Sequence, residues 1–278
     1  MTKALSILRG RFGRAALLDM DTSLVDHAHP HFHLIFKASG PEQNFVVEGE
    51  RVPLGSDMLV AVNSWQQHAY VHRRDAERTL FLALYIEPGW LAQADRAFSG
   101  CSASGFFPRA GIPITGEIER LRTDLVQRMA DPFDAHDDLP EQILKLCLTV
   151  SHGFSSWRER DAGAAGNNGA KDYRVSRALR HMRDHAADAI DLDDVARAAG
   201  LSRPHFNHLF RHCTGVSPRL YANALRVESA VGRLQRQDEI GGISGDLGFS
   251  AQSNFTRFFQ QHTGTSPNQY RRVMADLG

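Results

Sequence analysis

The amino-acid sequence predicts an α+β protein of two domains, with an N-terminal β-barrel carrying a helical pair and an all-helical C-terminal domain. Three observations predict this fold class. Short runs of β-branched, aromatic and aliphatic residues, separated by turn residues, fill positions 27–86. Apolar residues at helical spacing dominate from position 172 onward. Between the two patterns lies a segment without a large apolar residue. We therefore expect a domain over 1–160, a linker over 161–171 and a second domain over 172–278.

The length and composition are those of an ordinary globular protein. At 278 residues the chain is long enough for two cores. Its three cysteines are widely spaced and odd in number, which argues against a disulfide framework and for a reducing compartment. No apolar run approaches the roughly 18 residues of a membrane span or the core of a signal peptide. We expect a cytoplasmic protein without a membrane partner.

The charge is unevenly distributed, although the formal net charge is zero. Residues 171–278 contain 15 Lys and Arg against 11 Asp and Glu, which is a balance of +4, so the remainder carries −4. A basic half suits a polyanion such as nucleic acid. The excess is modest, which argues against an architectural DNA protein.

In the N-terminal half, turn residues separate four expected strands at regular intervals, which is typical of a small sandwich or barrel. The expected strands cover residues 32–38, 44–47, 57–62 and 79–86. One short helix is expected over 90–98, followed by two amphipathic helices over 115–130 and 139–157. This helical pair could form a dimerisation surface or pack on the barrel.

The C-terminal half contains one pattern twice, with every matching pair of residues 49 positions apart. The first copy is Phe206, Phe210, Thr214, Gly215, Ser217, Pro218 and Tyr221, and the second is Phe255, Phe259, Thr263, Gly264, Ser266, Pro267 and Tyr270. Each copy predicts a short helix, a glycine turn and a second helix. We therefore expect two helix-turn-helix units over about 191–213 and 240–262.

The second helix of such a unit can enter the major groove of DNA with the face that its apolar residues leave free. Arginine can bond guanine, and Asn or Gln can bond adenine. The alternative is that these residues only form a solvent-exposed helix face without a partner. The presence of a second such face at equivalent positions of the repeat makes this alternative weaker. The candidate DNA-binding residues are Arg203, Pro204, Asn207, His208 and Arg211 in the first unit and Ala251, Gln252, Ser253, Thr256, Arg257 and Gln260 in the second.

Residues 172–278 resemble the DNA-binding domain of the AraC family of bacterial transcription regulators. The resemblance rests on Asp194-Val195-Ala196, Gly200-Leu201-Ser202, Arg226-x3-Ala230-x3-Leu234 and Gly248-Phe249-Ser250-x4-Phe255-x3-Phe259-x4-Gly264-x-Ser266-Pro267-x2-Tyr270-Arg271. It implies two recognition helices in successive major grooves of double-stranded DNA, about 34 Å apart. It also implies that Arg271 and Arg272 lie near phosphates or brace the second unit.

The second unit departs from the family in its first helix, where residues 240–246 include three glycines. Each glycine costs about 1 kcal/mol in a helix interior. We predict that this unit is less ordered than the first in the absence of DNA.

Histidines crowd the start of the β region, at positions 27, 29, 31 and 33, with a further one at 68. Alternation would place the first four on one face of an early strand, where imidazoles could bind a divalent transition metal. Residues 15–86 also resemble a cupin, a fold with His-x-His-x3–4-Glu on one strand and another His on a later strand. His33 stands at the Glu position.

The cupin resemblance implies a sensor pocket that binds either a metal ion or a small organic effector. The metal ligands would be His27, His29, His33 and His68. The effector-binding residues would be His27, His29, His33, Phe36, Trp65 and His68.

The predicted function is sequence-specific, effector-responsive DNA binding by a transcription regulator that is not an enzyme. The alternative is a metal-dependent cupin enzyme, such as a dioxygenase, with a helical appendage. The expected partners are double-stranded DNA, a small-molecule effector and a second copy of the chain, with RNA polymerase as a further candidate.

Overall fold

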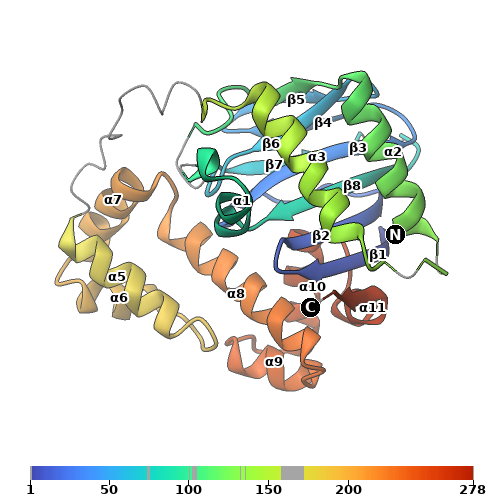
Figure 1. The fold of residues 1–278 in the computed structure, drawn as a ribbon. Helices are drawn as coiled ribbons and strands as arrows, with labels where there is room; N and C mark the ends of the chain where they lie inside the picture. The colour runs from blue at the N-terminus through green and yellow to red at the C-terminus, as the bar shows by residue number, and fades with distance from the viewer. Residues whose placement is uncertain are drawn as a thin grey trace.

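The computed structural model describes residues 2–73, 76–99, 101, 105–131, 133–134, 136–157 and 172–277. It has a β-rich N-terminal half and a helical C-terminal half that lie against each other (Figure 1). The predicted linker, 161–171, lies outside the described residues. The predicted two-domain layout is confirmed.

The N-terminal half is built from two sheets. Its strands are β1 (Lys3–Gly10), β2 (Gly13–Met20), β3 (Phe32–Ser39), β4 (Gln43–Val47), β5 (Glu50–Leu54), β6 (Met58–Val62), β7 (His68–Val71), β8 (Thr79–Ile86) and β9 (Gly111–Pro113). The larger sheet has the order β10-β1-β2-β8-β3-β6-β9, and the smaller has the order β5-β4-β7. The four expected strands form near their predicted bounds, whereas β1, β2, β5, β7 and β9 were not predicted. Pro53 is compatible with β5 because this strand lies at a sheet edge.

Helices cover one face of the larger sheet. They are α1 (Pro88–Ala94), the 3-10 helix η1 (Arg96–Phe98), α2 (Gly116–Ala130) and α3 (Leu139–Phe154). The apolar sides of α2 and α3 join Phe32, Leu34 and Phe36 of β3 in one core. The expected single helix over 90–98 is divided at Asp95, whose side chain accepts a hydrogen bond from Ala97 N and begins η1. The helical pair therefore packs on the barrel, and its role in dimerisation stays a prediction.

The C-terminal half contains the two expected helical units and the helix that joins them. Its helices are α5 (Tyr173–Asp184), α6 (Leu192–Ala198), α7 (Arg203–Thr214), α8 (Pro218–Gln235), α9 (Ile240–Asp246), α10 (Gln252–Thr263) and α11 (Pro267–Val273). The first unit uses α6 and α7, and the second uses α9 and α10. Helix α8 runs beneath the barrel from one unit to the other (Figure 1).

The duplicated residues have matching structural roles, which explains why the pattern recurs. Gly215 and Gly264 end α7 and α10 in the left-handed conformation, with φ of 79° and 78°. Two residues later, the hydroxyls of Ser217 and Ser266 accept hydrogen bonds from backbone N–H groups at the starts of α8 and α11. The next residue is proline at the first helical position in both copies.

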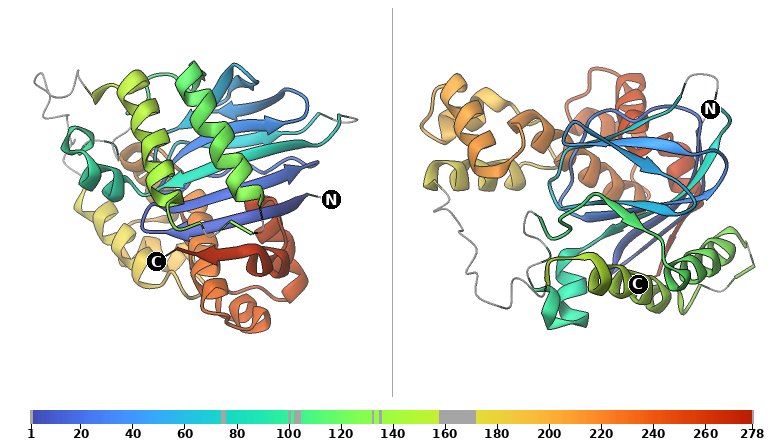
Figure 2. Two further views of the ribbon diagram at one scale, coloured as in Figure 1. Left: turned by 45° about the vertical axis from the view of Figure 1, so that its right-hand side comes forward. Right: turned by 90° about the horizontal axis from the view of Figure 1, so that it is seen from above.

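The C-terminal half is not all-helical, which corrects the prediction. After α11 the chain forms β10 (Met274–Asp276), which pairs in parallel with β1 (Figure 2). Leu277 N also donates to Arg9 O at 2.7 Å. The last residues of the helical half thus complete the sheet of the β-rich half.

The two halves share a hydrophobic core. Ile7 and Met20 of the barrel pack in one cluster with Val231 of α8, Phe259 of α10 and Tyr270 of α11. The second helix-turn-helix unit is therefore held against the barrel by buried apolar side chains as well as by β10.

Candidate DNA interface and histidine site

The predicted reading residues of the first unit lie on the outer side of α7. Phe206 and Phe210 are fully buried and fix the inner side of this helix. Pro204, Asn207, His208 and Arg211 are exposed. Arg203 is half-buried, and its Nη1 donates to Asp193 Oδ1 of α6 at 3.2 Å. Four of the five residues are thus free to meet a partner, and Arg203 contacts the supporting helix.

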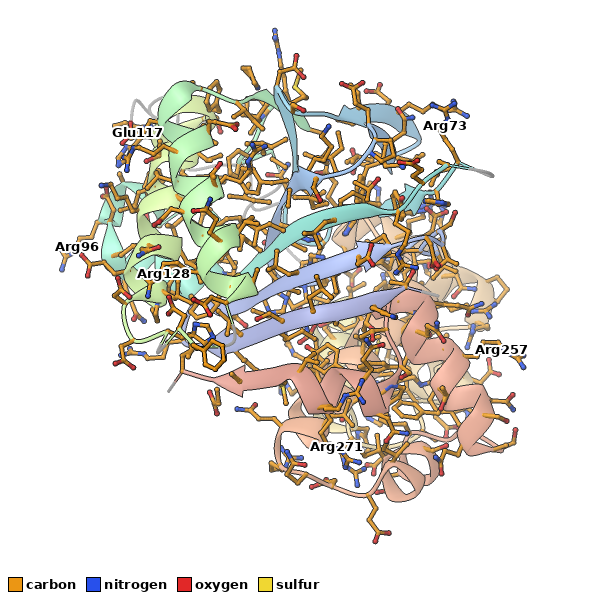
Figure 3. The ribbon with its side chains drawn as sticks, turned by 90° about the vertical axis from the view of Figure 1, so that its right-hand side faces the viewer. Arg73, Arg96, Glu117, Arg128, Arg257 and Arg271 are labelled. Carbon is orange, nitrogen blue, oxygen red and sulfur yellow. The ribbon has the colours of Figure 1, made fainter. Side chains whose placement is uncertain are left out.

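The predicted reading residues of the second unit also share one face. Ala251, just before α10, is exposed, as are Gln252, Ser253 and Arg257, whereas Thr256 and Gln260 are half-buried. All except Ala251 line one open groove. Figure 3 shows Arg257 on the side of α10 that points away from the barrel. The face is therefore accessible while the unit is docked.

Arg271 supports the second unit in this structure. It is half-buried on α11, and its Nη1 donates to Asp238 O in the turn between α8 and α9 at 3.1 Å. Arg233 bonds the side chains of Asp238 and Asp246 from the α8 side. Of the two roles that the family resemblance implied for Arg271, bracing matches its contacts here.

The glycine-rich helix α9 forms in spite of its composition. Ile240 and Ile243 are buried, and the three glycines are on the exposed side. The helix spans 7 residues, like α6. Its packing against the shared core offsets its low intrinsic helix propensity.

The five histidines singled out in the N-terminal half, at positions 27, 29, 31, 33 and 68, are all buried. The expected early strand does not exist, because β3 begins at Phe32 and only His33 belongs to it. Instead, His27 and His68 form an isolated antiparallel bridge, with each backbone N–H 2.9 Å from the other residue's carbonyl oxygen. This bridge brings the second histidine segment beside the first.

Three of the four predicted metal ligands converge. One nitrogen of each of His27, His29 and His68 lies within 4.8 Å of the corresponding nitrogens of the other two. Each Nδ1 lies within hydrogen-bond distance of a backbone carbonyl oxygen: that of Val25 at 2.8 Å, His31 at 3.0 Å and Gln66 at 2.8 Å, respectively. A carbonyl only accepts, so each Nδ1 carries the proton and each Nε2 has a free lone pair. All three Nε2 atoms are buried and have no hydrogen-bond partner among the described residues.

The other two histidines of the segment have different surroundings. His33 stacks on Tyr85, with ring centroids 4.0 Å apart. Within the part of the chain that the structure describes, neither of its ring nitrogens has a hydrogen-bond partner. It lies beside the trio and is not part of the converging group. His31 Nε2 is 2.9 Å from Glu87 Oε1, and this contact lowers the pKa of Glu87.

Burial favours the neutral form of His27, His29, His33 and His68. It lowers the pKa of His27, His29 and His33 well below the ordinary value, and that of His68 to about 4. The neighbouring imidazoles lower the pKa values of the first three further because like charges repel. A neutral imidazole is the form that binds metal ions.

Of the other predicted effector-binding residues, Phe36 lies away from the histidines, and Trp65 bonds His29 O through its backbone N–H at 2.8 Å but turns its ring toward the helical half. Phe36 is three positions from His33, so strand alternation places it on the opposite face of β3, in the core under α2 and α3. Its assignment to the pocket is therefore wrong. Trp65 stacks on Tyr221 of α8, with centroids 4.4 Å apart and an interplanar angle of 18°. It contacts the helical half.

A small cavity of about 20 Å³ separates the histidines from the helical half. His27, His29 and Arg14 line it from the barrel, and Val227, Glu228 and His262 line it from α8 and α10. Arg14, Glu228 and His262 were not predicted from the sequence, because elements more than 200 positions apart bring them together. No local pattern in the sequence signals this contact.

Arg14 joins the halves through buried polar contacts. Its guanidinium lies 4.0 Å above the ring of Tyr85, and its Nη1 donates to the Tyr270 hydroxyl at 3.4 Å. Its Nη2 is 3.9 Å from Glu228 Oε1. Burial opposes its charge, but interactions with Tyr270 and Glu228 hold the pKa of Arg14 above its ordinary value. A buried charge needs such partners.

The β-rich half, the duplicated helix-turn-helix units and their exposed faces define a two-domain transcription regulator with a ligand-binding domain. A model of the AraC-like ligand binding domain matches residues 18–147, and a helix-turn-helix domain model matches residues 195–273. The chain belongs to the AraC family. Among its described residues, no helix is long and apolar enough to cross a membrane.

Similar proteins include two named regulators. The transcriptional activator RhaS of Klebsiella pneumoniae is 25% identical over 254 residues, which cover 88% of this chain and 86% of RhaS. The regulatory protein PocR of Salmonella typhimurium is 30% identical over 144 residues, which cover 50% of this chain and 48% of PocR. A solved structure of ToxT from Vibrio cholerae covers 98% of both chains with a TM-score of 0.56 at 12% identity, so it shares the fold.

Proposed function

We propose that the protein reads specific DNA sequences with α7 and α10 and changes its DNA binding when a small-molecule effector binds its N-terminal half. The observation that carries this proposal is the pair of accessible polar faces at equivalent positions of a duplicated unit. Arg211 and Arg257 supply guanine donors on these faces, while Asn207 and Gln252 supply adenine partners. Membership of the AraC family supports a regulator over the alternative of a cupin enzyme.

The contacts between the halves offer a route from effector to DNA. The barrel contacts α8 through Trp65 and the end of α10 through Val25 N, which donates to Gln261 O at 3.2 Å. The cavity between them has room for about one water molecule. A larger ligand therefore has to separate α8 from the histidine segment. That separation would alter how the two reading helices are held, which gives the ligand different affinities for two states.

The structure constrains the chemical class of the effector less than it constrains the position where the effector would bind. ToxT of Vibrio cholerae has been solved with a bound unsaturated fatty acid, so this fold can accommodate a small organic ligand. For the present chain we propose an effector that enters between the histidine segment and α8. Homodimer formation through the outer sides of α2 and α3 and contact with RNA polymerase remain predictions.

Selection of bound sequences from random double-stranded DNA by the full-length chain tests the proposal. We expect one enriched motif, bound at least about 10³-fold more tightly than unrelated DNA at the same salt concentration. Asn207→Ala and Gln252→Ala should each relax the preference at one position of the motif. Arg120→Ala, an exposed change on α2, is the matched control and should leave the motif unchanged. Binding that is equally tight to all sequences would refute sequence-specific reading.

A further inference from the structure

We propose that His27, His29 and His68 bind one divalent transition-metal ion through Nε2, and that His262 of α10 supplies a fourth ligand. The ion would then fasten the second DNA-reading helix to the barrel. The site itself stands independently of DNA binding, and only its regulatory consequence rests on the proposed function.

The unsatisfied nitrogens carry the first step. A buried polar atom without a partner is costly, and three such Nε2 atoms among the described residues, on histidines that converge, require an explanation. The Nδ1–H groups of His27, His29 and His68 all donate to backbone carbonyls. Such bonds fix the tautomer and ring orientation of metal-binding histidines in general. The trio therefore has the orienting hydrogen bonds of a metal site as well as the ligand atoms.

The distances are compatible with one ion after a small adjustment. Metal–nitrogen distances of about 2.0–2.1 Å in a tetrahedral site place the nitrogens about 3.4 Å apart. The three nitrogens lie within 4.8 Å of one another here. Binding of an ion would therefore require small changes in χ1 and χ2 of these side chains that keep the Nδ1–H hydrogen bonds and bring the nitrogens closer together.

His262 connects the trio to the reading helix. Its ring centroid is 6.4 Å from that of His27, close to the 5.9 Å between His27 and His29. Its Nδ1 is 2.7 Å from Phe258 O, so Nε2 again has the lone pair. His262 is buried and lines the same cavity as His27 and His29. Like His33, it lies outside the converging trio, so it would have to move toward the ion. Among the described residues of the helical half, it is the histidine whose ring contacts the trio.

The chemistry of the donors selects the class of ion. The converging group contains imidazoles without a carboxylate, which suits Zn²⁺, Cu²⁺, Ni²⁺ or Fe²⁺ and does not suit Ca²⁺ or Mg²⁺. The guanidinium of Arg14 lines the same cavity and would repel a cation. Glu228 lies against that guanidinium from α8 and offsets its charge.

Direct metal titration of the full-length chain, freed of metal by a chelator, tests the proposal. Calorimetry with Zn²⁺ should give one ion per chain, and Co²⁺ should give the intense visible absorption of a four-coordinate site. His68→Gln should abolish stoichiometric binding. His262→Gln should weaken Zn²⁺ binding at least about tenfold. His212→Gln, an exposed change on α7, is the control and should leave the affinity unchanged.

Each contrary outcome has a defined meaning. Absence of stoichiometric Zn²⁺ and Co²⁺ binding by the native chain would overturn the proposal, and this result does not depend on any variant folding. If His33→Gln weakens binding and His262→Gln does not, His33 is the fourth ligand and the link to α10 is refuted.

Measuring DNA affinity with and without Zn²⁺ distinguishes the existence of the metal site from its effect on DNA binding. Affinity for a selected DNA site should change when Zn²⁺ is added to the native chain and should not change in His262→Gln. Metal binding without any DNA binding would refute the proposed function alone. Metal and DNA binding with no effect of Zn²⁺ on DNA affinity would refute the regulatory link.

Discussion

The stacked pair of Trp65 and Tyr221 provides a quantitative test of docking between the two halves. The rings are 4.4 Å apart at an interplanar angle of 18°. Stacked aromatic pairs contribute about 0.5–1.5 kcal/mol beyond their buried area. Trp65 is half-buried, so Trp65→Ala should also remove about 75–125 Å² of contact, or about 2–3 kcal/mol. Trp65 has a φ of 63°, and Ala at this position would have the same backbone strain, so the strain does not contribute to the change in the free energy of unfolding.

A double-mutant cycle of Trp65→Ala and Tyr221→Ala isolates the contact itself. Tyr221 also packs on Phe210 within the first unit, and the cycle cancels this contribution. Denaturant unfolding followed by circular dichroism should give a coupling energy of about 0.5–1.5 kcal/mol. The exposed Phe133 offers a control cycle with Trp65, which should be additive. A Trp65–Tyr221 coupling energy below about 0.3 kcal/mol would refute docking in solution.

Three further predictions concern the helical half. Gly248→Ala should destabilise the protein by about 1–3 kcal/mol more than Gly215→Ala. Both glycines have positive φ, but only a Cβ at position 248 would clash, at 2.5 Å from the Cβ of Ala189. Equal losses of the free energy of unfolding in denaturant would contradict this prediction. A chain ending at Val273 lacks β10 and should melt roughly 2–4 °C lower for each kcal/mol of pairing lost; an unchanged Tm would mean that β10 does not pair with β1. Residues 240–246 should exchange amide hydrogens faster than residues 192–198, because three glycines weaken α9; equal protection would exclude this difference.

The parts of the fold with strong local signals were predictable. The helices α2 and α3 follow from apolar spacing, and β3 and β8 follow from β-branched and aromatic runs. The repeated Thr-Gly-x-Ser-Pro segment marked both helix ends and the helix starts that follow, because each residue type has one role in that turn. Strand β2 was missed because its alanines have low strand propensity. Strand β10 was missed because three residues carry no periodic signal, and it forms where β1 offers an unpaired edge.

The candidate site was predictable in composition and not in geometry. Histidine spacing and the cupin resemblance identified His27, His29 and His68, although a bridge from His27 in a loop to His68 at the start of β7, and not one shared strand, brings them together. Phe36 was assigned to the wrong face although its odd spacing from His33 excludes a shared one. The role of His262 depends on how α10 docks on the barrel. That docking results from the shared core and β10, which no single segment encodes.

Mapping of base contacts on a selected DNA site tests most directly whether α7 and α10 read DNA together. Methylation interference with the full-length chain should show two patches of guanines whose methylation prevents binding, on one face of the DNA and about one helical turn apart. Arg211→Ala should remove contacts in one patch, and Arg257→Ala should remove contacts in the other. A single patch, or two patches that neither substitution changes, would contradict the account.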